Sequence, residues 1–273
     1  MGEVAAVSLV HRYLTDVIHG GRFEVLTEIL VPDYRFDTGG TWLAGRDEHY
    51  IPMVSGYLAD EPTIDTASHD LVTDGRYVAV WLTKYTTDPL AGWDAVLIYR
   101  SNGTQLDRCW SEQDWAARRR QLKGRQVPAP SPTSALGVWD VPVGPADPET
   151  EMAVAAWLAA NPGDIGDIGD VGGAGRPGVA GTTRPELDVE SLEVNCLFTA
   201  GDRFGFHVTQ RGTYIDGVPG CAQYRGRAAQ LHLAGIGTVA GGAVSSARVV
   251  TDSSELGRRL AAPVAVAGHT SSS

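Results

Sequence analysis

The sequence predicts an α+β protein built from two related domains, each with helices on one face of a curved antiparallel sheet. In the first half, helical periodicity comes first and β-rich runs follow, and this segregation is typical of α+β folds. The length of 273 residues is enough for about two domains, each with its own core. Three segments of the first half also recur in the same order in the second half, which indicates a duplication.

Helices are expected at the start of the chain. Apolar residues at steps of three and four predict an amphipathic helix over residues 4–18. The residues that form this pattern are Val7, Val10, Leu14, Val17 and Ile18. Further helices are expected at residues 22–30 and 47–58, with a strand around residues 34–36 between them. The apolar face of the first helix requires a sheet to cover.

Strands follow these helices. Four β-rich runs are joined by Asp-Gly and Asn-Gly turns, which is the pattern of consecutive antiparallel strands. These runs cover residues 63–72, 76–86, 93–100 and 105–112. Asp114 then begins a short basic helix that closes the unit.

The second half repeats this order in a shortened form. The matched segments are residues 73–81 with 199–207, 98–106 with 237–244, and 114–122 with 252–260. An opening helix is expected near residues 147–160, and the glycine-rich stretch after it is interpreted as a mobile loop. The expected division is a first domain at 1–125, a linker at 126–146, a degenerate second domain at 147–262 with a glycine-rich loop at 161–183, and a disordered tail at 263–273.

Composition and charge disfavour several classes of protein. The chain has 22 Lys and Arg against 33 Asp and Glu, a formal net charge of −11, which disfavours binding to nucleic acid or to an anionic membrane. No apolar run approaches the roughly 20 residues that span a bilayer, and Glu3 stands where a signal peptide carries a positive charge. Cys109, Cys196 and Cys221 form no CxxC pair, so neither a disulfide framework nor a zinc site is expected. We therefore expect a soluble cytoplasmic protein.

Four segments in order resemble a known superfamily. They are the opening helix with Tyr13, the VPDYRFD segment at 31–37 followed by Gly45, the HDLVTDGRYVAVW strand entry at 69–81, and the closing LDRCWSEQDWAARRRQL segment at 106–122. Together they resemble the nuclear transport factor two-like superfamily, in particular SnoaL-like polyketide cyclases and limonene-type epoxide hydrolases. The resemblance covers the first domain nearly throughout, and the second domain only at its opening helix and in its last third.

This resemblance implies two tandem cone-shaped α+β barrels, the second of them degenerate. In each, a bent sheet and its helices form a cone that is open at one end. A mostly apolar pocket for a small hydrophobic substrate is then expected in the first cone. Two such domains in one chain are similar to the epoxide-opening cyclases of polyether polyketide pathways.

Candidate catalytic residues follow from the chemistry. Opening an epoxide, or moving a proton next to a carbonyl, needs an acid and a base that face each other in a dry pocket. The resemblance points to Asp37 and Asp65 as a carboxylate pair, and to Tyr13 as a hydrogen-bond donor to the leaving oxygen. Each has a structural alternative, because Asp37 fits a turn, Asp65 a solvated sheet edge and Tyr13 a packing aromatic.

Further candidates lie in the later strands. SnoaL-like aldol cyclases use an aspartate near the closing strand, and Asp114 is the nearest match, although it also fits the N-cap of the closing helix. His69 opens a strand and offers an imidazole as general base, with a purely structural histidine as the alternative. Trp81, Trp93 and Trp110 would line the pocket if their strands point inward, and core packing is the alternative.

The expected function is cofactor-independent acid–base catalysis on a polyketide-like hydrophobic small molecule in secondary metabolism, such as antibiotic biosynthesis. The reaction would be a cyclisation, an epoxide opening or an isomerisation. The alternative is a non-catalytic protein of the same fold that binds small molecules or scaffolds other proteins. No cofactor, metal, nucleic acid or membrane partner is expected.

The second domain is not expected to catalyse. It lacks a counterpart of Asp37 and has Ser191 opposite Asp65. We expect it to cover the outer face of the first sheet, as an internal pseudo-dimer, or else to hold a ligand near His207, which matches Trp81 in the duplication.

Overall fold

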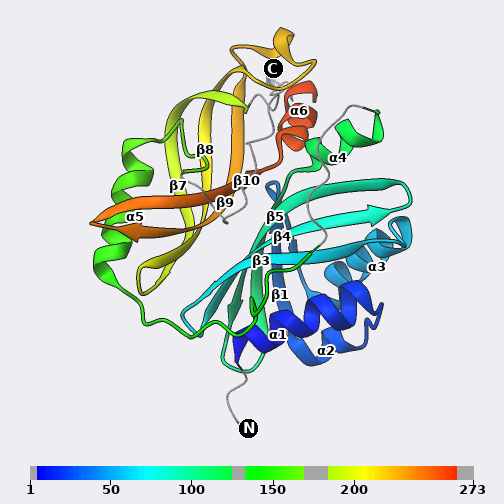
Figure 1. Ribbon diagram of the computed structural model, residues 1–273. Helices are drawn as coiled ribbons and strands as arrows, with labels where there is room; N and C mark the ends of the chain where they lie inside the picture. Colours follow the sequence, from blue (N-terminus) through cyan, green and yellow to red (C-terminus); the bar gives the residue numbers. More distant parts are fainter. Residues whose placement is uncertain (1–4, 125–132, 169–183, 263–273) are drawn as a thin grey trace, which may run out of the picture.

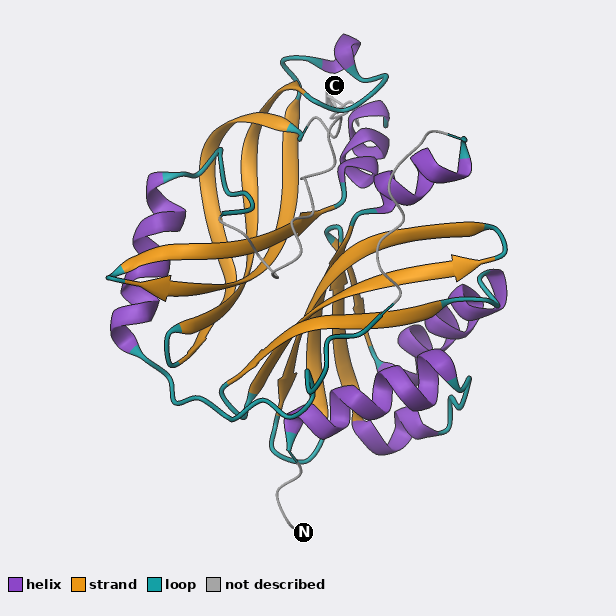
Figure 2. Ribbon diagram, in the orientation of Figure 1, coloured by secondary structure: helices purple, strands orange, loops and turns teal. Residues whose placement is uncertain are grey.

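The computed structural model describes residues 5–124, 133–168 and 184–262. Two β-sheets face each other in the middle of the molecule, and helices cover the outer faces (Figures 1 and 2). Helices and strands are segregated as the sequence predicts, so the expected α+β class is confirmed.

The first sheet has six strands in the order β2-β1-β6-β5-β4-β3. They are β1 (Leu30–Thr38), β2 (Thr41–Ala44), β3 (Asp65–Thr73), β4 (Tyr77–Thr87), β5 (Leu90–Ser101) and β6 (Leu106–Gln113). Neighbouring strands are antiparallel except β1 and β6, which are parallel. The four predicted β-rich runs are β3 to β6. The four-residue β2 has no counterpart in the prediction, because so short a segment shows no readable periodicity.

Helices cover one face of this sheet. They are α1 (Ala6–Arg12), which continues as the π-helix η1 (Tyr13–His19), α2 (Val25–Ile29), the π-helix η2 (Arg46–Tyr50), α3 (Ile51–Asp60) and α4 (Trp115–Leu122). The helix predicted at residues 4–18 is therefore present. In its predicted apolar stripe Val10, Leu14, Val17 and Ile18 are buried, and Val7 is partly buried. None of the described helices combines the length and the apolar character needed to cross a membrane.

The second sheet has four antiparallel strands in the order β10-β9-β8-β7. Its elements are α5 (Pro148–Ala160), β7 (Glu186–Ala200), β8 (Arg203–Asp216), the short 3-10 helix η3 (Ala222–Tyr224), β9 (Ala228–Ala240), β10 (Ala243–Thr251) and α6 (Ser253–Ala261). Four consecutive antiparallel strands and a closing helix repeat the order of β3 to β6 and α4. The segments matched in sequence thus occupy matching places in the two sheets.

Part of the expected linker packs on the first sheet. Residues 133–147 follow the edge strand β3, where the Ala135 amide donates to the Ser68 carbonyl (2.8 Å) and the Gly144 amide donates to the Thr73 carbonyl (3.0 Å). The described part of this segment is therefore not a free spacer. The rest of the expected linker lies outside the described residues. The same is true of residues 169–183 of the expected glycine-rich loop and of the expected tail at 263–273.

The two sheets share one apolar core. Along β4 the side chains alternate, so that Val80 and Leu82 face the helices while Ala79 and Trp81 face the second sheet. This shared core consists of Val72, Ala79, Trp81, Val96, Ile98 and Trp110 from the first sheet and Cys196, Phe198, Ala234, Ile236 and Val250 from the second. Two ion pairs, Arg203 with Asp70 and Arg248 with Asp94, also link the sheets.

Candidate functional site

The space between the helices and the first sheet is where the resemblance places a pocket. Buried side chains pack against one another there, where an open and mostly apolar pocket was expected. Polar groups are nevertheless embedded in this core. They are the phenols of Tyr13, Tyr34, Tyr50 and Tyr99, the thiol of Cys109 and the ammonium group of Lys84, with Tyr57 beside it. We call these residues the inner cluster.

Lys84 is the most unusual member of the inner cluster. It lies two positions after Leu82 on β4, which turns its side chain toward the helices, and only 6% of it is exposed. Its Nζ lies 5.2 Å from the centroid of the Tyr57 ring. Burial lowers the pKa of Lys84 to about 8. No carboxylate in the described part of the chain forms an ion pair with it.

The tyrosine hydroxyls of the inner cluster are only partly satisfied. The Tyr50 hydroxyl donates to the Tyr13 hydroxyl (2.8 Å), whereas those of Tyr34 and Tyr99 make no regular hydrogen bond within the described residues. The Cys109 thiol, a weak partner, interacts with both. Burial raises the pKa of each of these phenols, so they are neutral donors at ordinary pH.

The structure does not bring Asp37 and Asp65 together. On β1 the side chains alternate, so Asp37 lies on the face opposite Tyr34 and Phe36, where Arg108 donates to it (2.8 Å). Asp65 begins β3 and contacts His19 (2.7 Å) and the Tyr85 hydroxyl, which donates to it (2.7 Å).

Strand order explains this separation. The strands β1 and β3 are four strand spacings apart, roughly 19 Å along the sheet. The expectation of a converging carboxylate pair is therefore wrong. The alternation along β1 sends the Asp37 carboxylate to the other side of the sheet from the inner cluster.

The other predicted polar residues have structural contacts. Tyr13 belongs to the inner cluster, as described above. The Nε2 atom of His69 lies 2.8 Å from the Thr83 hydroxyl, and its ring packs on Trp81. Asp114 is the N-cap of α4 and accepts from the Ala117 amide (2.8 Å), so the capping interpretation is confirmed.

The three predicted tryptophans are packed in cores and lie on different faces of the first sheet. Trp81 and Trp110 lie in the core shared by the two sheets. Trp93 packs on Trp115, and its indole N–H donates to Gln113 (3.3 Å). Trp81 and Trp110 point away from the helices, so the pocket-lining prediction is wrong for them. Trp93 is paired with Lys84 across β4 and β5 and lies on the helix side, where it packs against Tyr57 and Trp115, so the packing alternative holds for all three.

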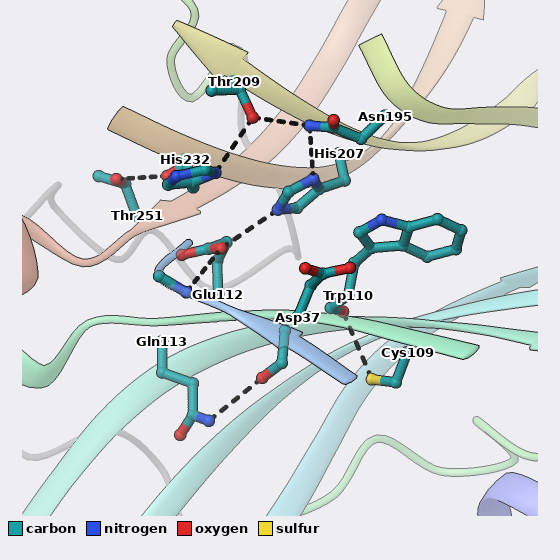
Figure 3. A network of polar contacts seen from close by, with 12 residues as sticks. Asp37, Cys109, Trp110, Glu112, Gln113, Asn195, His207, Thr209, His232 and Thr251 are labelled. Carbon is teal, nitrogen blue, oxygen red and sulfur yellow. Dashed lines mark hydrogen bonds and ion pairs between the residues drawn. The ribbon is translucent and has the colours of Figure 1, made fainter. Parts of the chain in front are cut away.

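A second group of polar residues lies between the sheets (Figure 3). We call it the interdomain cluster. It consists of Glu112 on β6, Asn195 on β7, His207 and Thr209 on β8, and His232 on β9. These residues alternate with apolar ones: Phe206 and Val208, for example, face the core of the second domain.

Hydrogen bonds connect the interdomain cluster from one sheet to the other. Glu112 Oε1 accepts from the Gly39 amide (3.2 Å) and lies 3.2 Å from His207 Nε2. His207 Nδ1 lies 3.1 Å from the side-chain amide nitrogen of Asn195, which also donates to the Thr209 hydroxyl (2.8 Å).

The chain of contacts ends at His232. The Thr209 hydroxyl lies 3.1 Å from His232 Nδ1. Two polar atoms of the cluster, Glu112 Oε2 and His232 Nε2, have no hydrogen-bond partner within the described residues.

Burial controls the charge state of this cluster. Only 1% of Glu112 and 3% of His207 are exposed. Burial raises the pKa of Glu112 well above its ordinary value, and it lowers the pKa of His207 to about 4 and that of His232 to about 3. Both imidazoles are thus neutral at neutral pH.

A small cavity adjoins the interdomain cluster. Its volume is about 60 Å³, and Asp37, Arg108, His207 and His232 are among the residues that border it. This is room for one or two water molecules or a single ion, but not for an organic substrate.

Sequence reasoning missed Lys84, Glu112 and His232. The sequence could have indicated that Lys84 is buried, because it is a charged residue at the end of the largely apolar run VAVWLTK. For Glu112 and His232 no local signal existed, because they are 120 positions apart and meet only through the packing of the two sheets.

Comparisons with known proteins give fold-level likeness only. No protein-family model matches the sequence, and no curated protein matches it. Among solved structures, a SnoaL-like polyketide cyclase from Agrobacterium tumefaciens is 21% identical, with 44% of this chain and 99% of that protein covered and a TM-score of 0.37.

Two other matching structures are of the same kind. IdmH from Streptomyces antibioticus, described as a polyketide cyclase, is 18% identical, with 42% and 96% covered and a TM-score of 0.39. A protein from a Jannaschia species, described as a SnoaL-like polyketide cyclase, is 17% identical, with 45% and 95% covered and a TM-score of 0.40. The functional assignment therefore rests on the residues of this chain.

Proposed function

We propose that the first domain catalyses proton transfer on a small, largely apolar molecule that carries a carbonyl or epoxide oxygen. The observation that carries this proposal is the buried Lys84, which forms no ion pair within the described residues and lies against the Tyr57 ring. A buried base whose pKa lies near the working pH is what general base catalysis requires. Most other side chains around it are apolar, which favours an apolar substrate.

Each group has a role in this proposal. Neutral Lys84 Nζ accepts a proton from the substrate, and the hydroxyls of Tyr34 and Tyr99 donate hydrogen bonds to the oxygen on which negative charge develops. Lys84 follows Val80 and Leu82 on the helix-facing side of β4, the side of the sheet on which Tyr34, Tyr99 and Cys109 also lie. Cyclisation, epoxide opening and isomerisation of a polyketide-like substrate all contain such a step.

The packed interior favours one alternative, a protein that binds a small molecule without changing it. The test uses a nitrobenzisoxazole, an activated carbon acid that reports a base in an apolar site. We expect a saturable rate that rises with pH around a midpoint near 8. Lys84→Met should lower this rate by about 100-fold or more, the usual contribution of a general base.

Matched variants complete the experiment. The chain contains one other lysine, the exposed Lys123, and Lys123→Met should leave the rate unchanged. Tyr99→Phe should reduce the rate without moving the pH midpoint. Equal rates for wild type and Lys84→Met would overturn the catalytic proposal, and saturable binding of the probe without turnover would identify a binding protein.

A further inference from the structure

We propose that Glu112, His207 and His232 form a zinc site that joins the two sheets. One ligand atom from each residue can be chosen so that all three lie within 4.8 Å of one another. Ligands of tetrahedral Zn²⁺, with bonds of about 2.0 to 2.2 Å, lie roughly 3.4 Å apart, so side-chain movements of about 1 Å would complete the site.

The histidines are held in the way that metal ligands are held. Each uses Nδ1 for a contact within its own sheet: His207 with the Asn195 amide, and His232 with the Thr209 hydroxyl. With the Asn195 amide turned over, its oxygen accepts from His207 Nδ1–H, an orientation that heavy-atom positions leave open. Both Nε2 atoms are then available to a metal. Such outer contacts fix the tautomer and orientation of metal-binding histidines.

Unpartnered polar atoms mark the same place. Glu112 Oε2 and His232 Nε2 are buried and make no hydrogen bond within the described residues. Leaving a buried polar atom without a partner is costly, and a bound cation would satisfy both atoms. The adjoining cavity of about 60 Å³ has room for a water molecule as a fourth ligand.

The first sheet approaches the histidines very closely. Gly40 has a φ of +73°, and a Cβ atom placed there would lie 2.3 Å from His232 Nε2. Glycine therefore allows the turn between β1 and β2 to close over the imidazole. The preceding amide, that of Gly39, donates to Glu112, so the same turn orients the carboxylate.

The donor set favours zinc. Beside the site, Arg108 is paired with Asp37, and Glu255 is paired with both Arg258 and Arg259. Two imidazoles and one carboxylate suit Zn²⁺ better than Mg²⁺ or Ca²⁺, which prefer oxygen ligands. This site differs from the sequence-based expectation of no metal, which considered only local motifs.

Metal titration of the full chain tests the proposal. Protein stripped with a chelator and dialysed is titrated with Zn²⁺ in competition with a chromogenic chelator, and one equivalent should bind. Glu112→Gln, His207→Gln and His232→Gln should each weaken binding by at least about 100-fold. Thr209→Val, which removes an outer contact, should weaken it by about 10- to 100-fold. His49→Gln, at an exposed histidine, is the matched control and should bind as wild type does.

A measurement on the unaltered protein guards against variants that fail to fold. X-ray absorption at the zinc edge should show two imidazoles among the ligands, and zinc should raise the melting temperature of wild type but not of the three ligand variants. The proposal is overturned if the wild-type protein binds no zinc, or if the spectrum lacks imidazole scattering. Binding equal in all three ligand variants and in wild type would also overturn it and leave a metal-free Glu–His hydrogen bond.

Discussion

Replacing Lys84 by methionine should make the protein more stable at neutral pH. The Lys84 side chain is 6% exposed, and burial lowers its pKa to about 8, from 10.5 in the unfolded chain. At pH 7 the folded protein must hold a buried, unpaired ammonium group. Methionine keeps the length of the side chain and its apolar contacts and removes only the charge.

The size of the effect follows from proton linkage. Between pH 8 and 10.5 the unfolded chain binds a proton that the folded chain has released, so stability rises with pH in this window. The titration of Lys84 therefore lowers the free energy of unfolding by about 3 kcal/mol at pH 7, by about 2 kcal/mol at pH 9 and by less than about 1 kcal/mol at pH 10. Loss of the contact with the Tyr57 ring offsets the gain by roughly 0.5 to 1 kcal/mol.

Urea unfolding of wild type and Lys84→Met at pH 7, 8 and 9 measures this difference. Other titrating groups, including the tyrosines, are common to both proteins and cancel in the comparison. Lys123→Met, at the exposed lysine, should show no pH-dependent difference from wild type. A Lys84→Met protein that is less stable than wild type at pH 7, or a difference that does not shrink with pH, would refute the reasoning.

Four other outcomes are expected. Ile236→Ala, at a fully buried position between the sheets, should cost about 2 to 5 kcal/mol in urea unfolding, and a loss below about 1 kcal/mol would contradict the shared core. Asp114→Ala should cost about 1 kcal/mol through loss of the α4 cap, while Asp114→Asn should cost less. Gly40→Ala should lower the melting temperature and displace His232, seen as a changed imidazole resonance in NMR spectra; an unchanged spectrum would argue against the close approach. In zinc-free protein, the free energy of unfolding should fall by about 2 kcal/mol between pH 7 and 5, because His207 takes up a proton in the unfolded chain but stays neutral in the folded chain. The fall should be smaller in His207→Gln.

Local patterns predicted most elements of the fold. About ten consecutive residues are enough to specify each of three features that occur in the structure: the apolar stripe of the opening helix, the turn-bounded strands and the Asp114 cap. The repeated order of elements in the two halves was also readable, because the matched segments contain turn residues and helix starts, which local sequence specifies. Local steric preferences and side-chain alternation determine these features, so sequence carries them directly.

The candidate sites were less accessible to such reasoning. Asp37 was assigned to the interior, although the alternation that buries Tyr34 and Phe36 sends it to the opposite face. For Glu112 and His207, the deciding contact is between two sheets whose mutual orientation no local pattern specifies. Polar residues on a strand can be buried between two sheets or exposed to solvent, and a single sequence does not distinguish the two cases.

Both halves of the facing pair of sheets belong to one polypeptide. Two identical subunits related by a twofold axis make every off-axis contact twice, so a glutamate that meets imidazoles across such an interface needs a second, identical set of the same residues. Covalent fusion removes that constraint, and here a glutamate on one face meets imidazoles on the other. The pairing of the two sheets is also independent of protein concentration, so dilution should not separate the glutamate from its histidines.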